Sequence, residues 1–439
     1  MTAVKGGILH RALRNAGLLL TGKAAAGVMQ LATFAIAARS LGLEEFGALS
    51  IVLAQIQLLI GIATFQSNQA VIRYGVAHVE ANDRAAFHGL VKVGTLFDLG
   101  AALAAATAAV LLAPLIGRWA GWDARLVLAA QLIAPLAFAY AIATPKGMLR
   151  LFGRFDLLAC HVTVAPAARL IGTIIAALLG GRLFGFVAVW LVAGYLGAAV
   201  ALWLGWREAA RHGLLTGFGP SLRDLTAANP GIWGFSAIAN LHSTLALGPG
   251  HLSTFAVGVV LGPASAGLMK VAQELGTGLA KPIDLLNQTV YPDLARLAAE
   301  GRWRRLRRLV VRSGVIAAAV SAGITVVLAL FGEDIVGAVF GPSYRAAHTV
   351  LLLISLATTV SVSAFAVDPA LYAAGRASRP LFTALAANAL FLAVLITLLP
   401  AEKLFAPGLA YVAAALVTVS LSAWWMKSAI PSPGVEKRQ

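Results

Sequence analysis

The feature that most constrains the fold is a series of apolar runs, each about twenty residues long, that fills most of the 439-residue chain. A helix of that length crosses the ~30 Å hydrocarbon core of a bilayer. In lipid, every backbone polar group must be bonded within a helix or a closed barrel, and barrel strands are only about ten residues long. With 59% hydrophobic and 12% charged residues, the chain is predicted to be an all-α polytopic membrane protein.

The apolar runs divide the chain into about twelve transmembrane helices in two six-helix bundles. We expect an N-terminal bundle at 1–212, a cytoplasmic linker at 213–231, and a C-terminal bundle at 232–439 that ends in a short cytoplasmic tail. Pro249, between two glycines, and Pro282 are expected to interrupt the seventh and eighth spans. The runs begin near residues 18, 48, 93, 126, 157, 184, 234, 263, 313, 350, 380 and 405.

The distribution of basic residues predicts the orientation. Twelve spans place both termini on one side, and that side carries 24 of the 34 Lys and Arg residues, whereas the opposite loops carry six. Because Lys and Arg concentrate in cytoplasmic loops, both termini are predicted to be cytoplasmic. The densest run, Arg302–Arg312, favours contact with anionic lipid headgroups, and a landing surface for a pyrophosphate headgroup is the alternative.

Three sequence landmarks recur between the halves. Leu-Gly at 41–42 with Gly47 returns at 261–262 with Gly267, Gly153-Arg154 returns as Gly375-Arg376, and the LIG ending at Gly117 resembles the LFG ending at Gly332. The offsets are about 220 residues. Since each half has an even number of spans, the halves are predicted to be parallel repeats, related by an axis along the membrane normal.

Polar residues within the spans are the candidate functional residues, since an intramembrane charge is costly and marks a pathway. In the eighth span, five of them fall within an arc of about 80° at 100° per residue: Lys270, Glu274, Lys281, Asp284 and Gln288. Two interpretations stay open. These residues line a hydrated cavity, or Lys270 with Glu274 and Lys281 with Asp284 form ion pairs within the helix.

The second span repeats the pattern, with Gln55, Gln66, Gln69 and Arg73 on one predicted face. Together with Lys23 in the first span and Arg169 in the fifth, these faces predict a cationic lumen suited to an anionic substrate, because Lys and Arg both bind phosphate. The predicted substrate-binding residues are Lys23, Arg73, Arg169, Lys270, Lys281, Gln66 and Gln288.

Acidic residues within the spans are candidates for ion coupling. Asp98 and Asp368 lack a basic partner on their own helices, so each is a candidate proton or sodium site or the partner of a neighbouring helix; Glu274 and Asp284 complete the set. His161, His242 and His251 show no metal-ligand spacing, and Cys160 is the only cysteine. We therefore expect no metal site and no cofactor.

Motifs of nucleotide-hydrolysing and other enzymes are absent: the sequence has no Walker loop, HExxH or GxSxG. We expect a transporter that is not an enzyme, has no catalytic residues and does not bind nucleic acid.

The segment AARSLGLEEFGALSIVLA at 37–54 resembles the start of the polysaccharide transporter family, the Wzx-type flippases of the MOP superfamily. Three later segments resemble that family in the same order: LGPASAGLMKVAQ at 261–273, YPDLARL at 291–297 and VFGPSYRAAHTVLLLIS at 339–355. The resemblance implies a V-shaped, two-bundle transporter of the bacterial inner membrane. His251 stands where the family often has an acidic residue.

The function implied by the resemblance is that of a flippase. It would move undecaprenyl-pyrophosphate-linked oligosaccharide from the cytoplasmic to the periplasmic leaflet by alternating access, for O-antigen, capsule or exopolysaccharide synthesis, with a polymerase and a chain-length regulator as partners. A MATE-like drug or cation antiporter is the first alternative, which the intramembrane basic residues disfavour. A membrane-embedded polysaccharide polymerase or ligase is the second, and the short loops disfavour it.

Overall fold

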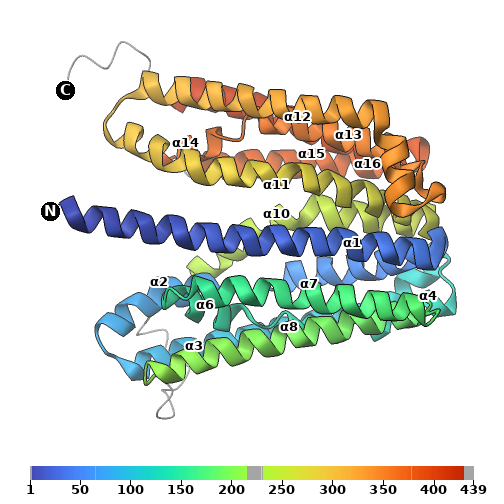
Figure 1. Ribbon diagram of the computed structural model, residues 1–439, viewed down its shortest axis with the longest axis horizontal. Helices are drawn as coiled ribbons and strands as arrows, with labels where there is room; N and C mark the ends of the chain where they lie inside the picture. Colours follow the sequence, from blue (N-terminus) through green and yellow to red (C-terminus); the bar gives the residue numbers. More distant parts are fainter. Residues whose placement is uncertain (1, 65, 215–228, 230, 377, 430–439) are drawn as a thin grey trace. The chain divides into compact units, whose positions relative to one another are not determined.

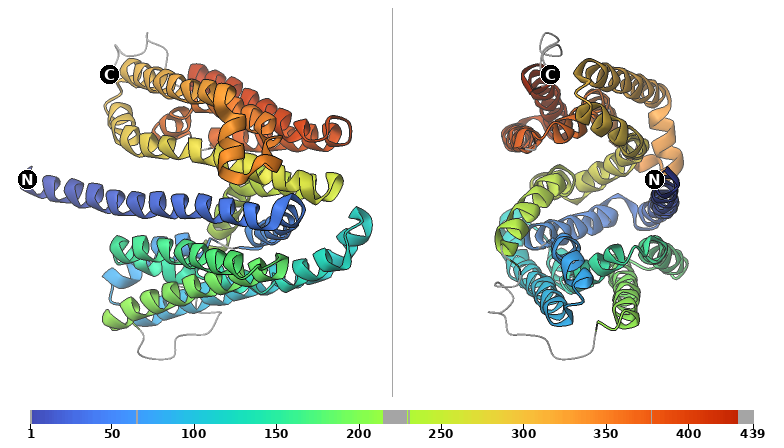
Figure 2. Two further views of the ribbon diagram at one scale, coloured as in Figure 1. Left: turned by 45° about the vertical axis from the view of Figure 1, so that its right-hand side comes forward. Right: turned by 90° about the vertical axis from the view of Figure 1, so that its left-hand side faces the viewer.

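The computed structural model describes residues 2–64, 66–214, 229, 231–376 and 378–429, and these contain helices and no strand. Figure 1 shows the helices side by side within each part of the chain, and Figure 2 includes a view nearly along their axes. The helices are α1 (Thr2–Ala63), α2 (Ser67–Glu80), α3 (Arg84–Ala120), α4 (Ala124–Leu132), α5 (Leu136–Ala139), α6 (Ala143–Leu151), α7 (Phe155–Leu178), α8 (Leu183–Arg211), α10 (Ile232–Leu261), α11 (Pro263–Ala299), α12 (Trp303–Phe340), the 3₁₀ turn η1 (Pro342–Tyr344), α13 (Ala347–Val362), α14 (Val367–Ala373), α15 (Ser378–Glu402) and α16 (Phe405–Ala429).

Nine stretches of the described residues are long and apolar enough to cross a membrane. The first, Leu20–Glu80, contains two spans because the non-helical residue Gly42 divides α1. Adding α10 and α11, each of 30 or more residues, gives the predicted twelve-span architecture. The helices α3 and α12 begin about ten residues before their apolar runs, because their polar first turns extend the same helix.

The predicted helix breaks are wrong in position. α10 continues through Pro249, and α11 continues through Pro282. In α10, side chains occupy the carbonyls around the proline: the Ser253 hydroxyl donates to Pro249 O at 2.6 Å, and the Gln273 amide donates to Gly250 O at 2.7 Å. Neighbouring side chains of this kind let a membrane helix accommodate a proline.

The structure instead breaks the second, fourth and tenth spans. In the second, α1 ends at Ala63 and α2 begins at Ser67, and the fourth is divided into α4, α5 and α6. The tenth is divided between α13 and α14. Pro145 and Pro369 each occupy the third position of the helix that follows a break, where a missing N–H is tolerated because it would have no intrahelical partner.

The turns between helices confirm that the sequence is repeated. The first half has left-handed backbone at Gly42, Asn82, Gly121, Gly153 and Gly180, and each has a counterpart 219–223 residues later, at Gly262, Gly301, Gly341, Gly375 and Lys403. Gly42 (φ 72°, ψ 178°) and Gly262 (φ 86°, ψ 176°) share a conformation that is essentially restricted to glycine. The third landmark is out of register. The C-caps of α3 and α12 are Gly121 and Gly341, which are 220 residues apart, whereas Gly117 and Gly332 are 215 residues apart.

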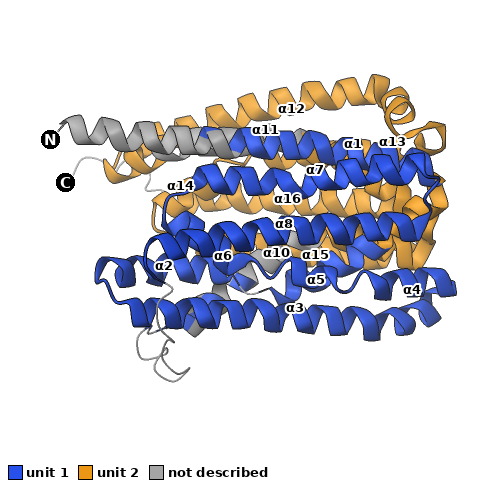
Figure 3. Cartoon of the chain, turned by 60° about the horizontal axis from the view of Figure 1, so that its bottom comes forward, with its two compact units in different colours: residues 1–41, 52–247 blue, residues 42–51, 248–439 orange. Residues whose placement is uncertain are grey.

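Packing divides the described chain into two compact units, shown in Figure 3. Unit 1 comprises residues 1–41 and 52–247, and unit 2 comprises residues 42–51 and 248–439. The ten residues from Gly42 to Ile51 thus pack with the C-terminal part of the chain. The predicted linker at 213–231 lies almost wholly outside the described residues, and the division at that segment stays a prediction.

The interior of unit 1 is built where α2, α3, α6 and α8 meet. Its largest described cluster contains Val71, Phe87, Val91, Met148, Ala209 and Leu214. Small residues allow close helix contacts at its edges: a Cβ on Gly94 would lie 2.7 Å from the Thr144 hydroxyl. This packing holds the broken second and fourth spans against the continuous helix α3.

The interior of unit 2 joins α11, α12, α14 and α16 through a cluster that includes Leu294, Leu306, Val310, Leu371 and Met426. The segment 42–51 adds a second contact, in which Gly47 and Gly267 bring the backbones of α1 and α11 together. A Cβ on Gly267 would lie 3.3 Å from Gly47 Cα. The repeated glycine motif therefore packs against its own copy.

Candidate functional site

A buried polar group in unit 1 surrounds Asp98, which is 3% exposed. Its Oδ2 accepts a hydrogen bond of 2.8 Å from the backbone N–H of Thr144, in the first turn of α6. A carboxylate at this place is stabilised by the positive end of the helix. Asp98 therefore partners a neighbouring helix, which is one of the two interpretations that the sequence leaves open.

The other oxygen of Asp98 has a different environment. Oδ1 is buried, and the hydroxyls of Ser67 and Thr144 lie close enough to interact with the carboxylate as donors, although none of these three oxygens has a hydrogen bond of good geometry. Ser67 is the first residue of α2 and is 4% exposed, and Thr144 is fully buried. Buried polar atoms are nearly always well hydrogen-bonded in proteins, so three such oxygens in one place mark a site.

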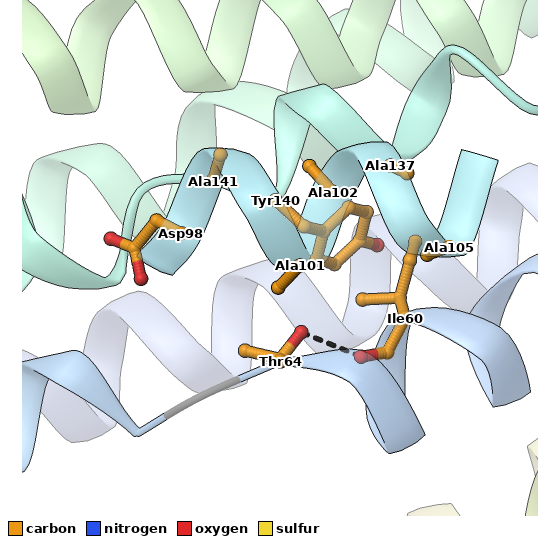
Figure 4. A pocket seen from close by; sticks show the side chains of 9 residues that line it. All are labelled: Ile60, Thr64, Asp98, Ala101, Ala102, Ala105, Ala137, Tyr140 and Ala141. Carbon is orange, nitrogen blue, oxygen red and sulfur yellow. Dashed lines mark hydrogen bonds between the residues drawn. The ribbon is translucent and has the colours of Figure 1, made fainter. Parts of the chain in front are cut away.

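A small pocket adjoins this cluster (Figure 4). Its polar lining comes from Asp98, Thr64 and Tyr140, and the remainder is Ile60 and five alanines. Thr64 lies at the break between α1 and α2, and Tyr140 at the break between α5 and α6. The break between α1 and α2 and the break between α5 and α6 therefore meet at one pocket.

Two residues near Asp98 were not identified as candidates from the sequence. Lys146 of α6 is half-buried and interacts electrostatically with Asp98. His161 of α7 is 6% exposed and interacts with Lys146. The sequence assigns Lys146 to a cytoplasmic loop, because the break after Tyr140 that places it in a separate helix is not visible in the hydropathy. No group of three His, Cys, Asp or Glu side chains able to hold a metal ion occurs among the described residues.

The predicted polar face of the second span is not one continuous face, because the break at 64–66 interrupts the helical phase. Gln55 is 3% exposed, and its amide lies 3.5 Å from Ala109 O of α3. Gln66 is half-buried at the start of α2, whereas Arg73 is exposed and its guanidinium lies 5.5 Å from the centre of the Tyr74 ring.

Lys23 and Arg169 also differ in their surroundings. Lys23 is exposed on α1. Arg169 of α7 is half-buried, and its guanidinium lies 5.3 Å from the centre of the Trp190 ring of α8. This distance is within the range of a cation–π interaction. The structure thus gives Arg169 a packing role within unit 1, and its contact with substrate stays a prediction.

In unit 2, Lys270 and Glu274 of α11 form an ion pair of 2.7 Å between Nζ and Oε1, with side chains 14% and 10% exposed. This geometry agrees with the ion-pair interpretation. His251 of α10 interacts electrostatically with both charges. The pair reduces the net positive charge that the sequence predicts for this face, and the assignment of Lys270 to substrate binding and of Glu274 to ion coupling stays a prediction.

Beside that pair, Gln273 connects three helices of unit 2. It donates to the Ser253 hydroxyl at 2.6 Å and accepts from the Thr254 hydroxyl at 2.6 Å. The Ser253 oxygen lies 3.5 Å from the Tyr411 hydroxyl of α16. This buried network fixes α10 against α11 and α16, although the sequence points to the neighbouring charges instead.

The other predicted site residues are only partly located. Lys281, Asp284 and Gln288 lie on α11, but their side chains are outside the described residues. Asp368 is half-buried in the first turn of α14, at the helix end where a negative charge is favourable. Lys281 and Gln288 as substrate contacts, and Asp284 and Asp368 as ion-coupling residues, stay predictions.

The basic run at the start of α12 has two distinct faces. Leu306 and Val310 are buried in the core of unit 2, whereas Arg304, Arg308 and Arg312 are exposed. The exposed side of the helix continues with apolar residues that are 52–62% exposed: Val311, Val315, Ile316 and Val320. A basic surface that changes to an exposed apolar surface along one helix is typical of the boundary between lipid headgroups and hydrocarbon.

Comparison with known proteins identifies the fold and the family resemblance. The model of the family described as polysaccharide biosynthesis protein matches residues 12–229. The resemblance predicted from the sequence is thereby confirmed. The inner membrane protein YghQ of Escherichia coli (strain K12) is 28% identical over 345 residues, which cover 79% of this chain and 97% of that protein. The protein is a multi-pass membrane protein.

Solved structures show the same fold over nearly the whole chain. An inward-facing multidrug resistance MATE family transporter of the MOP superfamily has a TM-score of 0.73 at 13% identity, covering 94% of this chain and 96% of its own. The lipid II flippase MurJ, in an inward closed conformation, has a TM-score of 0.71 at 12% identity, covering 93% of this chain and 87% of its own. The protein therefore shares the fold of these two transporters.

Proposed function

We propose that the protein moves undecaprenyl-pyrophosphate-linked oligosaccharide from the cytoplasmic to the periplasmic leaflet, for O-antigen, capsule or exopolysaccharide synthesis. The observation that carries the proposal is the match of residues 12–229 to the polysaccharide biosynthesis family on a fold shared with a lipid II flippase. The protein catalyses no covalent step in this function. A polysaccharide polymerase and a chain-length regulator would act on the translocated product.

Exposed cationic side chains are the groups best suited to the pyrophosphate. Lys23 and Arg73 are exposed on unit 1, whereas Lys270 and Arg169 are half-buried. Lys gives phosphate a mobile point charge, and Arg gives it a planar pair of donors. We therefore assign the first contacts with the pyrophosphate to Lys23 and Arg73.

The orientation that this function needs has both termini in the cytoplasm, as the distribution of basic residues predicts. Labelling of single cysteines tests it, after Cys160, the only native cysteine, is replaced by alanine. A cysteine at Asn82 should react only after the membrane is permeabilised, and one at Gly180 should react in intact spheroplasts. The reverse pattern would refute the orientation.

Glycan export tests the function itself. In a strain whose surface glycan depends on this protein, Lys23→Ala and Arg73→Ala should each reduce the glycan and leave lipid-linked repeat units on the cytoplasmic face. Arg118→Ala is the matched control, because Arg118 is also exposed but lies at the opposite end of unit 1. Lys23→Arg should retain export. Normal export in both alanine variants, at equal membrane abundance, would refute the assignment of these residues.

The MATE-like alternative gives a different result. A drug antiporter would lower the accumulation of a cationic dye in cells, and its loss would leave the surface glycan unchanged. We expect no dye efflux, because a cationic substrate is repelled by exposed Lys and Arg side chains. Dye efflux with normal glycan export in a deletion strain would favour the antiporter over the flippase.

A further inference from the structure

We propose that Asp98 binds and releases a proton, and that Ser67 and Thr144 form the remainder of this proton site. The three residues come from α3, α2 and α6, and all are at most 4% exposed. Both hydroxyls lie beside the carboxylate and can interact with it, but Oδ1, Oγ and Oγ1 have no hydrogen bond of good geometry. A buried intramembrane acid with poorly satisfied oxygens indicates a proton or ion site.

A proton on Oδ1 resolves the hydrogen-bond deficit. Oδ2 is already occupied, because it accepts from the Thr144 N–H at 2.8 Å. When Oδ1 carries a proton it becomes a donor, and the hydroxyl oxygens of Ser67 and Thr144 are acceptors beside it. When the proton leaves, either hydroxyl can rotate and donate to the carboxylate instead. The same three groups therefore satisfy both protonation states without a change of backbone.

The surrounding charges favour a proton over a metal cation. The first turns of α2 and α6 both begin at this site, and the N-terminus of a helix carries a positive partial charge. Lys146 adds a full positive charge nearby. A metal ion would place another positive charge among them, whereas a proton forms a bond to the carboxylate and leaves a neutral acid.

Two positive or partly positive groups act on the carboxylate, namely Lys146 and the Thr144 N–H. Other titratable groups near this region are Tyr140, at the end of α5 and lining the pocket, and His161 of α7 and Arg150 of α6, which both interact with Lys146. Asp98 also lines the pocket between the two helix breaks (Figure 4).

The proton site lies at the N-termini of α2 and α6, the helices that follow the breaks and that would move. Asp98 holds the start of α6 through Thr144, and Ser67 begins α2, so protonation removes a negative charge from two helix N-termini at once. Discontinuous helices of this kind carry the coupling ions of many transporters. The use of the proton to drive transport rests on the proposed function, whereas proton binding by Asp98 does not.

Infrared difference spectroscopy of the purified protein in detergent tests the site without any substrate. Between acid and alkaline buffer, we expect a carboxylic acid band that is present in the wild type and absent in Asp98→Asn. A pH-indicator dye should record about one proton fewer per chain for that variant. Asp98→Asn should fold, because the amide oxygen still accepts from Thr144 and the amide nitrogen replaces the protonated Oδ1 as donor.

Matched variants complete the test. Asp368→Asn is the control, because Asp368 also lies at the start of a half-helix but outside this cluster; it should leave the Asp98 band unchanged. Thr144→Val and Ser67→Ala should shift the band, since each removes one hydroxyl partner. A band that persists in Asp98→Asn would overturn the proposal. So would a sodium-dependent increase in thermal stability, at constant pH, that Asp98→Asn abolishes, because the site would then bind a metal cation.

Discussion

Replacing Gly47 with alanine tests the backbone contact by which residues 42–51 pack in unit 2. An added Cβ would overlap the carbonyl oxygen and carbon of Pro263, and it would lie 3.1 Å from Pro263 Cα. These are backbone atoms, so no side-chain rotation can relieve the overlap. The start of α11 or the segment after Gly42 has to move away, and the contact between Gly47 and Gly267 opens with it.

The expected cost follows from two opposing effects. Overpacking of a tight interior costs about 1–3 kcal/mol, whereas replacing glycine by alanine in a helix contributes about 1 kcal/mol of stability. Gly323→Ala in α12 measures the gain in helix propensity alone, because Gly323 is exposed and an added Cβ there has no atom within 4 Å. Since both variants gain the same helix propensity, we expect Gly47→Ala to be less stable than Gly323→Ala by about 1–3 kcal/mol.

The free energy of unfolding can be compared by reversible SDS titration of the two variants and the wild type in one mixed-micelle system. Gly323→Ala should equal or exceed the wild type, and Gly47→Ala should fall below it. If the two variants agree within ~0.5 kcal/mol, which is the usual size of a neutral surface effect, the close approach of the two repeated glycine motifs does not exist.

Three further predictions use the same measurement. Gly42→Ala and Gly262→Ala should each cost ~1–3 kcal/mol, because both glycines adopt a backbone conformation that other residues avoid. Gly121→Asn should be nearly neutral, because Asn tolerates the left-handed φ of 67° and ψ of 30° at that position. Equal costs at all three positions would contradict this prediction. Gln273→Leu should cost ~1–3 kcal/mol, because Thr254 loses its acceptor inside a buried network. Arg154→Gln should also destabilise the protein, because the guanidinium binds Asp156 through two nitrogens (2.9 and 3.1 Å) and binds Glu208 at 2.8 Å. Unchanged stability would show that the ion pairs of Arg154 with Asp156 and Glu208 contribute nothing.

Hydropathy predicts the spans well because the requirement for about twenty apolar residues is set by the bilayer. It predicts the breaks poorly because a proline alone does not decide whether a helix continues. Pro249 lies within a continuous helix because Ser253 and Gln273 bond the nearby carbonyls. Pro145 follows a break that the pattern of apolar residues does not reveal.

The same limitation affects the site residues. Angular arithmetic assumes one helix, so it fails for Gln55 and Arg73, which the break at 64–66 separates. It succeeds locally for Lys270 and Glu274, which are one turn apart and do form a pair. Lys146 was missed because its position against Asp98 depends on a contact between α3 and α6, and sequence spacing contains no information on that contact.

The two halves of the repeat differ in which helix supplies the negative charge at the N-terminus of the helix that follows the break. In the fourth span, Thr144 precedes Pro145, and the negative charge at the helix N-terminus is Asp98, supplied by α3. In the tenth span, Asp368 precedes Pro369 and supplies the charge from within the same helix. A charge on the helix itself moves with that helix, whereas a charge on a neighbouring helix holds the two together only while it stays ionised. Protonation of Asp98 therefore weakens one contact that joins α6 to α3.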